Sequence, residues 1–303
     1  MKCVVTGGAG FIGSNLVDKL IAEGNEVSVI DNFLSGKKEN CNKNAIYFNL
    51  DLSDTEKKSI ITDILQSAEV VFHCAALARV QSSIVDPVKY EVNNTLGTVN
   101  TLKSAVDAGV KRVVYSASSS VYGPTEKLPS KEEDSPNPIS PYANQKYYGE
   151  LCCKMFSSIY PIETVSLRYF NVFGERQNIG GAYATVVGIF IDQLLKNQQM
   201  TINGNGKQRR DFTYVQDVVN ANILASKSTK IGKGEVINIG SGTNISINTL
   251  AGSLGSDKKY VDSVDEPFAN LADIKRAKKL LDWEPTIDIL DWIKDYKILH
   301  GMK

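Results

Sequence analysis

Short apolar runs alternate with longer segments of helical periodicity over the first half of the chain. Strands are predicted by the β-branched runs at 2–6, 26–30, 69–73, 111–116 and 162–168, and helices by the patterns near 14–23, 89–108 and 141–159. This alternation indicates an α/β fold built on a doubly wound parallel sheet with helices on both faces. Beyond about residue 170 the alternation weakens, which indicates a smaller region of different organisation.

The segment 124–142, PTEKLPSKEEDSPNPISPY, is rich in proline and charge. Proline lacks a backbone donor and disfavours a helical conformation in the residue before it, so this segment predicts an ordered surface loop rather than a helix. The loop leads directly into the pattern that predicts the helix at 141–159.

The composition is that of an ordinary globular protein and excludes several kinds of partner. Of 303 residues, 42% are hydrophobic, and Lys+Arg and Asp+Glu both total 34, so no excess positive charge indicates a nucleic acid as partner. No apolar run approaches the about 18–20 residues that cross a bilayer, and a strand pattern rather than a secretion signal precedes the first glycines. We expect no nucleic-acid or membrane partner and a cytoplasmic location.

Cysteine and histidine offer little for metal binding or acid–base chemistry. Five cysteines, an odd number without C-x-x-C spacing, favour reduced thiols over disulfides or a zinc site; they are Cys3, Cys41, Cys74, Cys152 and Cys153. His73 ends an apolar run and is predicted to be a packed ring with a satisfied nitrogen, and nothing near His300 suggests a set of ligands. We therefore predict no metal.

A glycine cluster between the first strand and the first helix predicts a dinucleotide site. Two patterns fit, G-x-G-x-x-G at Gly8, Gly10 and Gly13 and G-x-x-G-x-x-G at Gly7, Gly10 and Gly13. The cluster follows the strand KCVVT and opens the helix SNLVDKLIAEG, so backbone N–H groups can approach a pyrophosphate at the positive helix end. The next strand ends at Asp31, whose carboxylate can accept from the adenosine ribose hydroxyls and favours NAD over NADP. The sequence therefore predicts an NAD-binding, Rossmann-like domain.

A tyrosine, a lysine and a run of serines predict chemistry beside that cofactor. Tyr142 and Lys146 lie four residues apart, on one face of the predicted helix. The strand VKRVVY runs into SASSSVYG, which places serine hydroxyls at the carboxyl end of a strand, where doubly wound sheets bind their ligands. A neighbouring ammonium and a positively charged nicotinamide are expected to lower the tyrosine pKa from its usual value of about 10. The phenolate can then take a proton from a substrate hydroxyl, with a serine as relay.

These motifs together resemble the extended short-chain dehydrogenases/reductases and, within them, the UDP-hexose 4-epimerases that act on UDP-glucose and UDP-N-acetylglucosamine. The resemblance covers almost the whole chain, in the order TGGAGFIGSNL, DNFLSGK, DLSD, HCAALARV, NNTLGT, SASSSVYG, SPYANQK, LRYFNVFG, RRDFTYVQDV and LADIKRAKKLLDW. We expect an NAD-binding domain of residues 1–170 with a later returning segment near 211–240. Residues 171–210 and 241–303 are expected to form a smaller C-terminal α/β substrate-binding region.

The resemblance implies roles for particular residues. Tyr142 is implied as the catalytic base, Lys146 as its electrostatic partner and ribose anchor, and Ser118 as the proton shuttle three positions before the Val of VYG. The implied cofactor contacts are Gly7, Gly10, Phe11, Ile12, Gly13, Asp31, Asn32, Ser35, Gly36, Asp51, Leu52, Ala75, Ala76, Asn94, Ser116, Tyr142, Lys146 and Tyr169. The implied substrate contacts are Ser118, Ser119, Tyr142, Asn171, Arg210 and Asn270. Arg210 also follows from its own chemistry, because a guanidinium fork suits phosphate.

The reaction implied by the resemblance is epimerisation at C4 of a nucleotide sugar. NAD oxidises the C4 hydroxyl, the 4-keto sugar turns about its diphosphate link, and hydride returns to the opposite face without net redox change. Ser119 and Ser120 stand where dehydratases of the family carry Asp and Glu and where decarboxylases keep the Glu. Because hydroxyls cannot replace carboxylic acids in elimination, epimerisation is the favoured reaction.

Residues near the C-terminus bear on the choice of sugar. Asn270 lies three positions before Asp273, where the resemblance connects a small residue with N-acetylated sugars as well as UDP-glucose, although an ordinary surface residue fits the position too. The family often carries a diphosphate-binding Arg where this chain has Ser263, and Lys258 or Lys259 are candidate replacements. We expect interconversion of UDP-GlcNAc with UDP-GalNAc and of UDP-glucose with UDP-galactose.

Alternatives remain open for both function and assembly. One alternative is a UDP-glucuronate 4-epimerase or another nucleotide-sugar-modifying member, and a second is an NAD-binding scaffold without catalysis, which the Tyr142/Lys146 pair disfavours. The helices around 89–108 and 141–159 form the dimer bundle of the family, so a homodimer is expected, although their apolar positions also fit packing against the sheet.

Overall fold

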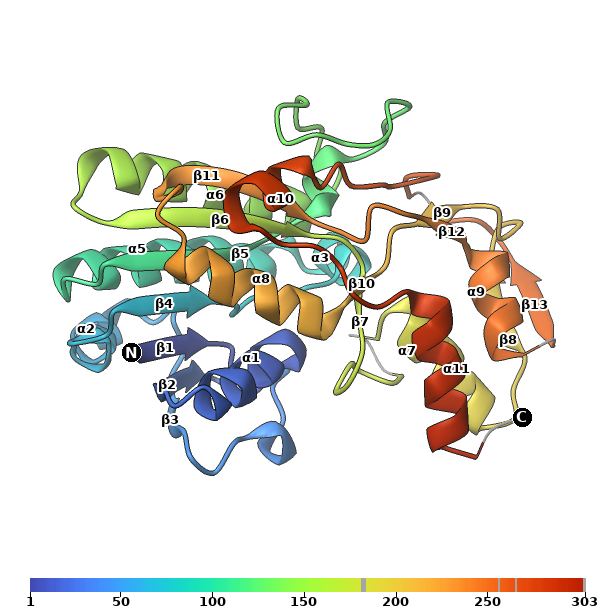
Figure 1. The fold of residues 1–303 in the computed structure, drawn as a ribbon, viewed down its shortest axis with the longest axis horizontal. Coiled ribbons are helices and arrows are strands. Elements are labelled where there is room, and N and C mark those ends of the chain that lie inside the picture. The colour runs from blue at the N-terminus through green and yellow to red at the C-terminus, as the bar shows by residue number, and fades with distance from the viewer. Residues whose placement is uncertain (181–183, 256, 265, 302–303) are drawn as a thin grey trace.

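A seven-stranded parallel sheet forms the centre of the protein in a computed structural model that describes residues 1–180, 184–255, 257–264 and 266–301 (Figure 1). In chain order its strands are β1 (Lys2–Thr6), β2 (Glu26–Asp31), β3 (Ile46–Asn49), β4 (Val70–His73), β5 (Arg112–Ser118), β6 (Glu163–Tyr169) and β11 (Lys233–Ile239). Their order across the sheet is β11-β6-β5-β4-β1-β2-β3, so the strand order reverses between β1 and β4. Open α/β sheets bind ligands at such a reversal, beyond the carboxyl ends of the strands. The predicted α/β fold is confirmed.

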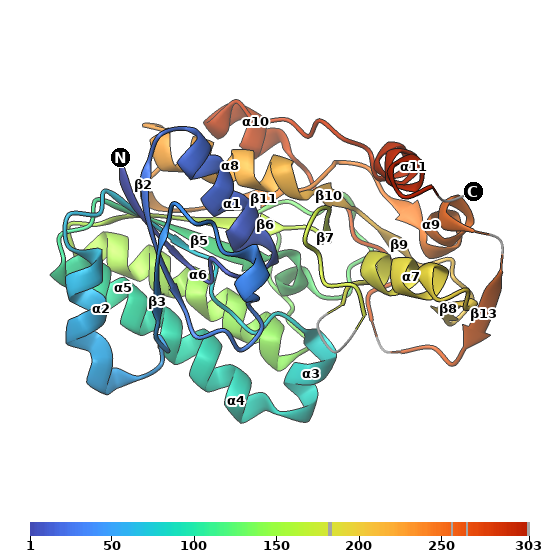
Figure 2. The ribbon, with the colours of Figure 1, turned by 90° about the horizontal axis from the view of Figure 1, so that it is seen from below.

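Helices cover both faces of the sheet and enclose two separate cores (Figure 2). The first core lies under α1 (Phe11–Ala22) and α8 (Val215–Lys227), and the second under α2 (Lys58–Leu65), α5 (Gly97–Asp107) and α6 (Pro141–Ile159). Because strand side chains alternate between faces, Cys3 and Val5 enter the first core and Val4 enters the second. Burial on both faces explains why these strands are continuous apolar runs in the sequence.

The predicted helix at 89–108 is built from three consecutive helical pieces. These are α4 (Pro87–Glu91), a π-helical turn at Val92–Leu96 (η3) and α5, and α3 (Val80–Val85) precedes them. Asp86 caps α4 by accepting from the backbone N of Lys89. The sequence predicted the helical extent but not the π turn, which is a local change of hydrogen bonding that leaves the side-chain pattern almost unchanged.

A smaller region lies beyond the carboxyl ends of the sheet strands (Figure 1). Its core contains α7 (Val186–Leu195), β8 (Met200–Asn203), α9 (Ile247–Leu254) and α11 (Ile289–Leu299), and β13 (Lys258–Val261) pairs in parallel with β8. Two further short pairs are β7 (Val172–Phe173) with β10 (Thr213–Tyr214), and β9 (Arg209–Arg210) with β12 (Ile245–Ser246). The last helix before α11, α10 (Lys275–Leu281), returns to pack against β11 and α8.

The sequence missed elements with weak apolar patterns. The five predicted strands match β1, β2, β4, β5 and β6, and the predicted helices match α1, the α4–α5 stretch and α6. β3 was not predicted because it is the edge strand next to β2 and leaves Ile46 63% exposed, so its pattern is neither buried nor alternating. The short helix α2 and the 3₁₀ turns Lys38–Asn40 (η1), Thr55–Lys57 (η2) and Ser119–Tyr122 (η4) were missed as well.

The prediction that His73 is a packed ring with satisfied nitrogens is confirmed. All five cysteines are free thiols. His73 is 1% exposed, with Nδ1 2.7 Å from Thr6 Oγ1 and Nε2 3.0 Å from Thr98 Oγ1, so both ring nitrogens are hydrogen-bonded. Within the described part of the chain, no helix has both the length and the apolar character needed to cross a bilayer.

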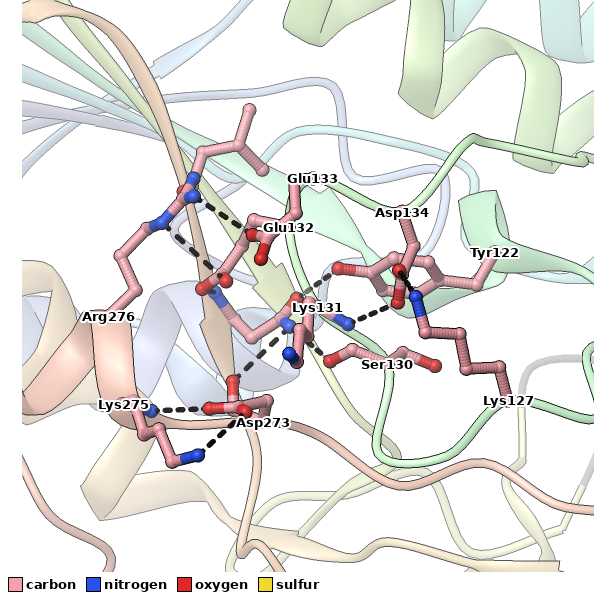
Figure 3. Close-up of polar contacts among 12 residues, drawn as sticks. Tyr122, Lys127, Ser130, Lys131, Glu132, Glu133, Asp134, Asp273, Lys275 and Arg276 are labelled. Carbon is pink, nitrogen blue, oxygen red and sulfur yellow. Dashed lines mark hydrogen bonds and ion pairs between the residues drawn. The ribbon is translucent and has the colours of Figure 1, made fainter.

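The proline-rich loop before α6 is tied to the C-terminal segment of the chain. Its Ser130 is 2% exposed and accepts through its backbone O from Asp273 N at 2.9 Å. Figure 3 shows Arg276 of α10 reaching Glu132 and Glu133, with closest nitrogen–oxygen distances of 3.6 Å and 3.2 Å. These contacts explain how a loop without helix or extended strand is ordered, as the sequence predicted.

Candidate active site

The glycine loop between β1 and α1 has a geometry that requires glycine. Gly7 has a φ of +70°, and its backbone O accepts from Gly10 N at 3.1 Å. A Cβ on Gly13 would lie 2.2 Å from Gly7 O, inside any allowed contact, whereas a Cβ on Gly8 would meet the side chain of Val29 in β2. Gly7, Gly10 and Gly13 line a pocket, so the second of the two glycine patterns is the one that faces it.

Asp31 ends β2 beside this loop. It is 7% exposed, and its two carboxylate oxygens accept from Ala9 N at 2.9 Å and Phe33 N at 2.8 Å. Gly36 passes directly over it, because a Cβ on Gly36 would lie 2.8 Å from Asp31 Oδ1. The predicted Gly36 therefore permits the loop to close over the acid without lining the pocket itself. Bare backbone at the glycine loop and a carboxylate at the end of β2 fit a dinucleotide with a free 2′-hydroxyl.

Asp51 lies on the same side of the pocket, after β3. Its oxygens accept from Asn32 Nδ2 at 3.1 Å and from Ser53 N at 2.8 Å and Ser53 Oγ at 2.6 Å. Burial opposes the ionised form of Asp51, but these hydrogen bonds and nearby Lys57 outweigh it, so its pKa is lowered. The carboxylate is fixed in its charged state at the end of the pocket predicted for adenine.

The pocket extends from the glycine loop to the carboxyl ends of β5 and β6. The predicted cofactor contacts that line it are Gly7, Gly10, Phe11, Ile12, Gly13, Asp31, Asn32, Ser35, Asp51, Leu52, Ala75, Ala76, Ser116, Tyr142, Lys146 and Tyr169. Sequence reasoning missed the lining residues Ile30, Leu34, Leu50, Cys74, Leu77, Ala78, Asn93, Ala117, Val172, Asn178 and Thr185. Most of these residues lie next to a predicted residue in the chain, and this adjacency could have indicated them. No periodic pattern pointed to Asn178 or Thr185.

Asn94 differs from its predicted role as a lining residue. The pocket wall is formed by Asn93, and the side chain of Asn94 points to the chain behind the wall. Its Oδ1 accepts from Leu77 N at 2.8 Å, and its Nδ2 donates to Leu77 O at 3.0 Å and to Gln145 Oε1 at 3.0 Å. Asn94 thus holds the lining residue Leu77 in place through its side-chain amide.

Tyr142 and Lys146 project from the first turns of α6. The helix begins sharply at Pro141 because Ser140 Oγ accepts from Ala143 N at 3.2 Å and proline is preset for the first helical position. The phenol of Tyr142 interacts with the side chain of Ser118 at the end of β5. The structure therefore brings the predicted base and shuttle together.

Burial governs the charge states of this tyrosine and lysine in the protein alone. It raises the pKa of Tyr142 to about 12, and the interaction with Ser118 lowers it by less than burial raises it. Burial also lowers the pKa of Lys146 to about 8. The expected lowering of the tyrosine pKa by the ammonium and a positively charged nicotinamide together stays a prediction.

The predicted nicotinamide end of the pocket contains a chain of hydrogen-bonded polar groups. Ser116 Oγ lies 3.1 Å from Tyr169 OH and donates to Cys74 Sγ at 3.3 Å. Tyr169 OH in turn donates to Asn222 Oδ1 at 3.0 Å. Lys146 Nζ donates to Ser116 O at 2.7 Å, so the lysine and this chain are fixed to the same strand end.

Three of the predicted substrate contacts form one cluster. Asn171 Nδ2 donates to Asn270 Oδ1 at 3.1 Å and to Asp211 O at 2.7 Å, and Asn270 Oδ1 also accepts from Asp211 N at 2.8 Å. Arg210, which is 8% exposed, precedes Asp211 and forms an ion pair with Glu266 at 2.8 Å. The cluster lies outside the pocket lining, and so do Ser118 and Ser119.

The candidate replacements for the diphosphate-binding Arg do not gather near Arg210. Lys258 Nζ donates to Asn248 O at 3.3 Å, and Lys259 is an exposed residue of β13. Ser263 is exposed as well, in the segment after β13. Arg210, whose guanidinium is paired with Glu266, stays the predicted cation for a diphosphate.

Comparison with known proteins agrees with this site. The family model described as the NAD dependent epimerase/dehydratase family matches residues 3–240. A UDP-glucose 4-epimerase of Mycolicibacterium smegmatis is 34% identical over 306 residues, covering 97% of this chain and 96% of the relative. The chain therefore belongs to the NAD-dependent epimerase/dehydratase family, its cofactor is NAD, and the resemblance stated from the motifs is confirmed.

Solved structures with a similar fold support the same family relationship. The crystal structure of a UDP-glucose 4-epimerase from Thermotoga maritima with UDP-glucose has a TM-score of 0.92 and 36% identity, covering 99% of this chain and 100% of that one. A UDP-N-acetylglucosamine 4-epimerase from Methanobrevibacter ruminantium in complex with UDP-N-acetylmuramic acid has a TM-score of 0.90 and 37% identity, covering 99% of both chains. Relatives of nearly equal similarity thus carry names with two different sugars.

Proposed function

We propose that the protein is a 4-epimerase of UDP-sugars that interconverts UDP-GlcNAc with UDP-GalNAc, and UDP-glucose with UDP-galactose, through a 4-keto intermediate. The observation that carries the proposal is the meeting of Tyr142, Lys146 and Ser118 at the carboxyl end of β5, where the pocket that starts at the glycine loop ends. The names of the similar epimerases, which include both kinds of sugar, support the choice of substrates.

The chain's own residues supply binding and proton transfer. NAD, when bound, supplies the acceptor and donor of hydride beside the sugar. Tyr142 takes the proton of the C4 hydroxyl, and Ser118, which interacts with the same phenol, relays it. Because burial raises the pKa of Tyr142 to about 12, this transfer needs an additional positive charge beside the phenol. Proton transfer is therefore confined to the loaded pocket.

The residues after the shuttle favour epimerisation over elimination. Ser119 and Ser120 follow Ser118 in the 3₁₀ turn, so this turn carries hydroxyls in place of the carboxylic acids that dehydration needs. The alternatives remain a UDP-glucuronate 4-epimerase or another nucleotide-sugar-modifying enzyme, and an NAD-binding scaffold. Asn270 supports N-acetylated sugars as part of this proposal, although its side chain is already engaged by Asn171 and Asp211.

A substrate test without added cofactor separates these possibilities. Purified protein is incubated with UDP-GlcNAc, UDP-glucose and UDP-glucuronate in turn, and the anomeric protons of the products are followed by NMR. We expect UDP-GalNAc and UDP-galactose to form. Turnover of UDP-glucuronate alone would support the alternative substrate. If protein that retains NAD turns over none of the three sugars, the result would support the NAD-binding scaffold.

The Tyr142→Phe substitution tests the catalytic assignment. Removing the phenol oxygen is expected to lower kcat by about 10²–10⁴-fold, the range of general acid–base catalysis, while bound NAD is retained. The matched control is Tyr148→Phe on the exposed side of the same helix, which should leave kcat unchanged. Full activity of Tyr142→Phe would overturn the assignment; NAD is measured by its absorbance after acid extraction.

We further propose that two copies of the chain associate through α6 and the helical stretch from the end of α3 to η3. In the middle of this stretch α4 contacts α6, and both the stretch and α6 carry a stripe of exposed apolar residues spaced three or four apart. The stripe of the α3–η3 stretch consists of Val85, Val88, Val92 and Leu96, and that of α6 of Tyr148, Leu151, Met155 and Ile159. A second copy would remove this apolar surface from water, which supports the expected homodimer.

The division into regions and the compartment also remain proposals. The presence of β11 in the large sheet supports a cofactor domain of residues 1–170 with a returning segment near 211–240. The separate core around α7, α9 and α11 supports a substrate-binding region of 171–210 and 241–303. Free thiols at all five cysteines fit a cytoplasmic protein.

A further inference from the structure

The helix that carries the candidate catalytic pair presents a third polar residue on the same face. Tyr142, Lys146 and Glu150 follow one another at intervals of four residues in α6. Lys146 is 4% exposed; its Nζ donates to the neutral carbonyl of Ser116 and lies 5.0 Å from the centre of the Tyr115 ring. A buried ammonium with neutral contacts of this kind tends to lose its proton.

Glu150 is held by a buried arginine from the neighbouring strand. Arg168 of β6 donates from Nε to Glu150 Oε1 at 2.8 Å and from a terminal nitrogen to Oε2 at 2.7 Å, and both side chains are 3% exposed. The guanidinium carbon lies 4.7 Å from the centre of the Tyr122 ring, and Tyr122 OH donates to Asn238 Oδ1 at 2.7 Å. The pair therefore joins α6 to β6 and to the 3₁₀ turn that follows Ser118.

Most other titratable groups around Lys146 are neutral. Burial lowers the pKa of His73 to about 3 and raises the pKa values of the Cys74 and Cys153 thiols and of the Tyr115 phenol. Burial also raises the pKa of Glu150, but the two hydrogen bonds and the positive charge of Arg168 oppose this, and a guanidinium fork pairs with an ionised carboxylate. With the phenol of Tyr142 also neutral, Glu150 is the carboxylate of this set.

We propose that Glu150, fixed by Arg168, is a positioning residue that keeps the Lys146 ammonium charged at the wall of the cofactor pocket. It acts through Lys146 and touches neither substrate nor cofactor in the proposed reaction. Its consequence for catalysis rests on the proposed function, whereas its effect on Lys146 does not.

The two partners of the ion pair act on Lys146 with opposite signs. Replacing Glu150 removes the negative charge nearest to Lys146 along the helix and leaves Arg168 as an unpaired cation, so both changes disfavour a second positive charge. Replacing Arg168 leaves Glu150 as an unpaired anion, which favours the ammonium. If the ion pair only joined α6 to β6, removal of either partner would change the titration midpoint of Lys146 in the same way.

The test is a pH titration of Lys146 by NMR. The protein is labelled with [ε-¹³C]lysine, and the signal of Lys146 is assigned by its loss in Lys146→Arg. In Glu150→Gln we expect the midpoint of the titration to fall by about one pH unit relative to wild type, and in Arg168→Met we expect no fall. Equal midpoints in wild type and Glu150→Gln, or a fall of equal size in both variants, would overturn the proposal.

A double variant and a matched control complete the design. Removing one partner of a buried ion pair strongly destabilises a protein, but replacing both partners by apolar residues is often tolerated. If the single variants do not fold, Glu150→Leu/Arg168→Met therefore tests the proposal. Its midpoint should fall by less than that of Glu150→Gln, and a wild-type value would overturn the proposal. The control is Glu163→Gln at the opposite ends of the same strands, where Glu163 pairs with Arg112; no change in the Lys146 midpoint is expected.

The pH profile of kcat/KM then connects Lys146 to activity. In Glu150→Gln the alkaline limb should move to lower pH by the same amount as the NMR midpoint, and unchanged limbs would overturn the catalytic part of the proposal. If none of the UDP-sugars is turned over, the proposed function fails, but the NMR titration still decides the role of Glu150.

Discussion

At the residue scale, burial decides which side chains near the pocket carry charge. The ring of His73 is neutral because it is buried. Burial also lowers the pKa of Lys146 and raises the pKa of Tyr142. Asp31, in contrast, accepts hydrogen bonds from the backbone N of Ala9 and of Phe33. The pocket thus combines a carboxylate held by backbone donors at the predicted ribose end with poorly solvated groups at the predicted reacting end.

The buried ring of His73 makes stability depend on pH. Its folded-state pKa of about 3 lies below the value of 6.5 for the exposed group, so between these values the unfolded chain binds a proton that the folded protein does not. Stability contributed by this residue is complete above pH 6.5 and falls by about 1.4 kcal/mol per pH unit below it. Urea unfolding at pH 7.5 and 5 should show a smaller loss of stability in His73→Gln than in wild type.

The matched control for this prediction is His300→Gln, since His300 is exposed at the end of α11. Its loss of stability between the two pH values should equal that of wild type. An equally steep loss in His73→Gln would show that other groups cause the acid sensitivity.

The carboxylate of Asp31 should set the choice between NAD and NADP. In Asp31→Ser the affinity for NADH is expected to fall by about tenfold or more, because charge-assisted hydrogen bonds to the ribose are lost, while the penalty against a 2′-phosphate disappears. Fluorescence titrations with NADH and NADPH measure both effects. Asp54→Ser is the control, because Asp54 caps the turn after β3 outside the pocket. Unchanged discrimination in Asp31→Ser would place the ribose elsewhere.

At the element scale, close contacts between backbone segments shape the site. The glycine loop folds back on Gly7 O, and α6 approaches β5 so closely that a Cβ on Gly149 would lie 2.2 Å from Tyr115 OH. The first contact brings the start of α1 to the carboxyl end of β1, and the second packs the middle of α6 against a side chain of β5. They require glycine for space rather than for flexibility.

Two helical glycines provide a matched pair of substitutions. Gly13→Ala places a methyl group 2.2 Å from Gly7 O and should destabilise the fold by about 1–3 kcal/mol and abolish NAD binding. Gly252→Ala in α9 meets only Lys258 Nζ at 3.6 Å and should stabilise the protein by about 0.5–1 kcal/mol without affecting NAD. Thermal unfolding and bound-NAD content measure both. If Gly13→Ala retained NAD, this would contradict the inference that NAD lies against the backbone of the glycine loop.

At the scale of the whole molecule, two cores cover the large sheet and a third lies in the smaller region. Pocket residues come from the carboxyl ends of the sheet strands and the loops after them, from α6, and from the segment that begins at β7. The helices α3, α4 and α6 lie on the opposite face of the sheet from α8 (Figure 2). Association of two chains through the two apolar stripes would leave the smaller region outside the interface.

Charged residues in one stripe should prevent the proposed association. Leu151→Glu/Met155→Glu is expected to be a monomer in light scattering with unchanged circular dichroism, whereas wild type is expected to be a dimer, because two charges cannot be buried in an apolar interface. Ile298→Glu, at a more exposed position of α11, is the control and should remain a dimer. A monomeric wild type at micromolar concentration would contradict the proposal.

Local patterns in the sequence determined the sheet strands, the main helices and the glycine loop. Strands buried on both faces are continuous apolar runs, and helices with one buried face have a period of 3.6, so both can be recognised without knowledge of the fold. The family was recognised in the same way, because its motifs lie at strand ends that are fixed by local chemistry. The edge strand β3 was missed, since half of its surface faces solvent.

Tertiary structure alone decided the electrostatics of the site and the second contacts of its residues. The sequence named Tyr142 and Lys146 but could not show that burial opposes their charged forms, or that Glu150 meets Arg168 across helix and strand. It placed Asn94 at the pocket, whereas the side chain of Asn94 is hydrogen-bonded to the backbone of Leu77. Solvation and contacts between segments far apart in the chain depend on how the elements pack, and no local pattern of residues records them.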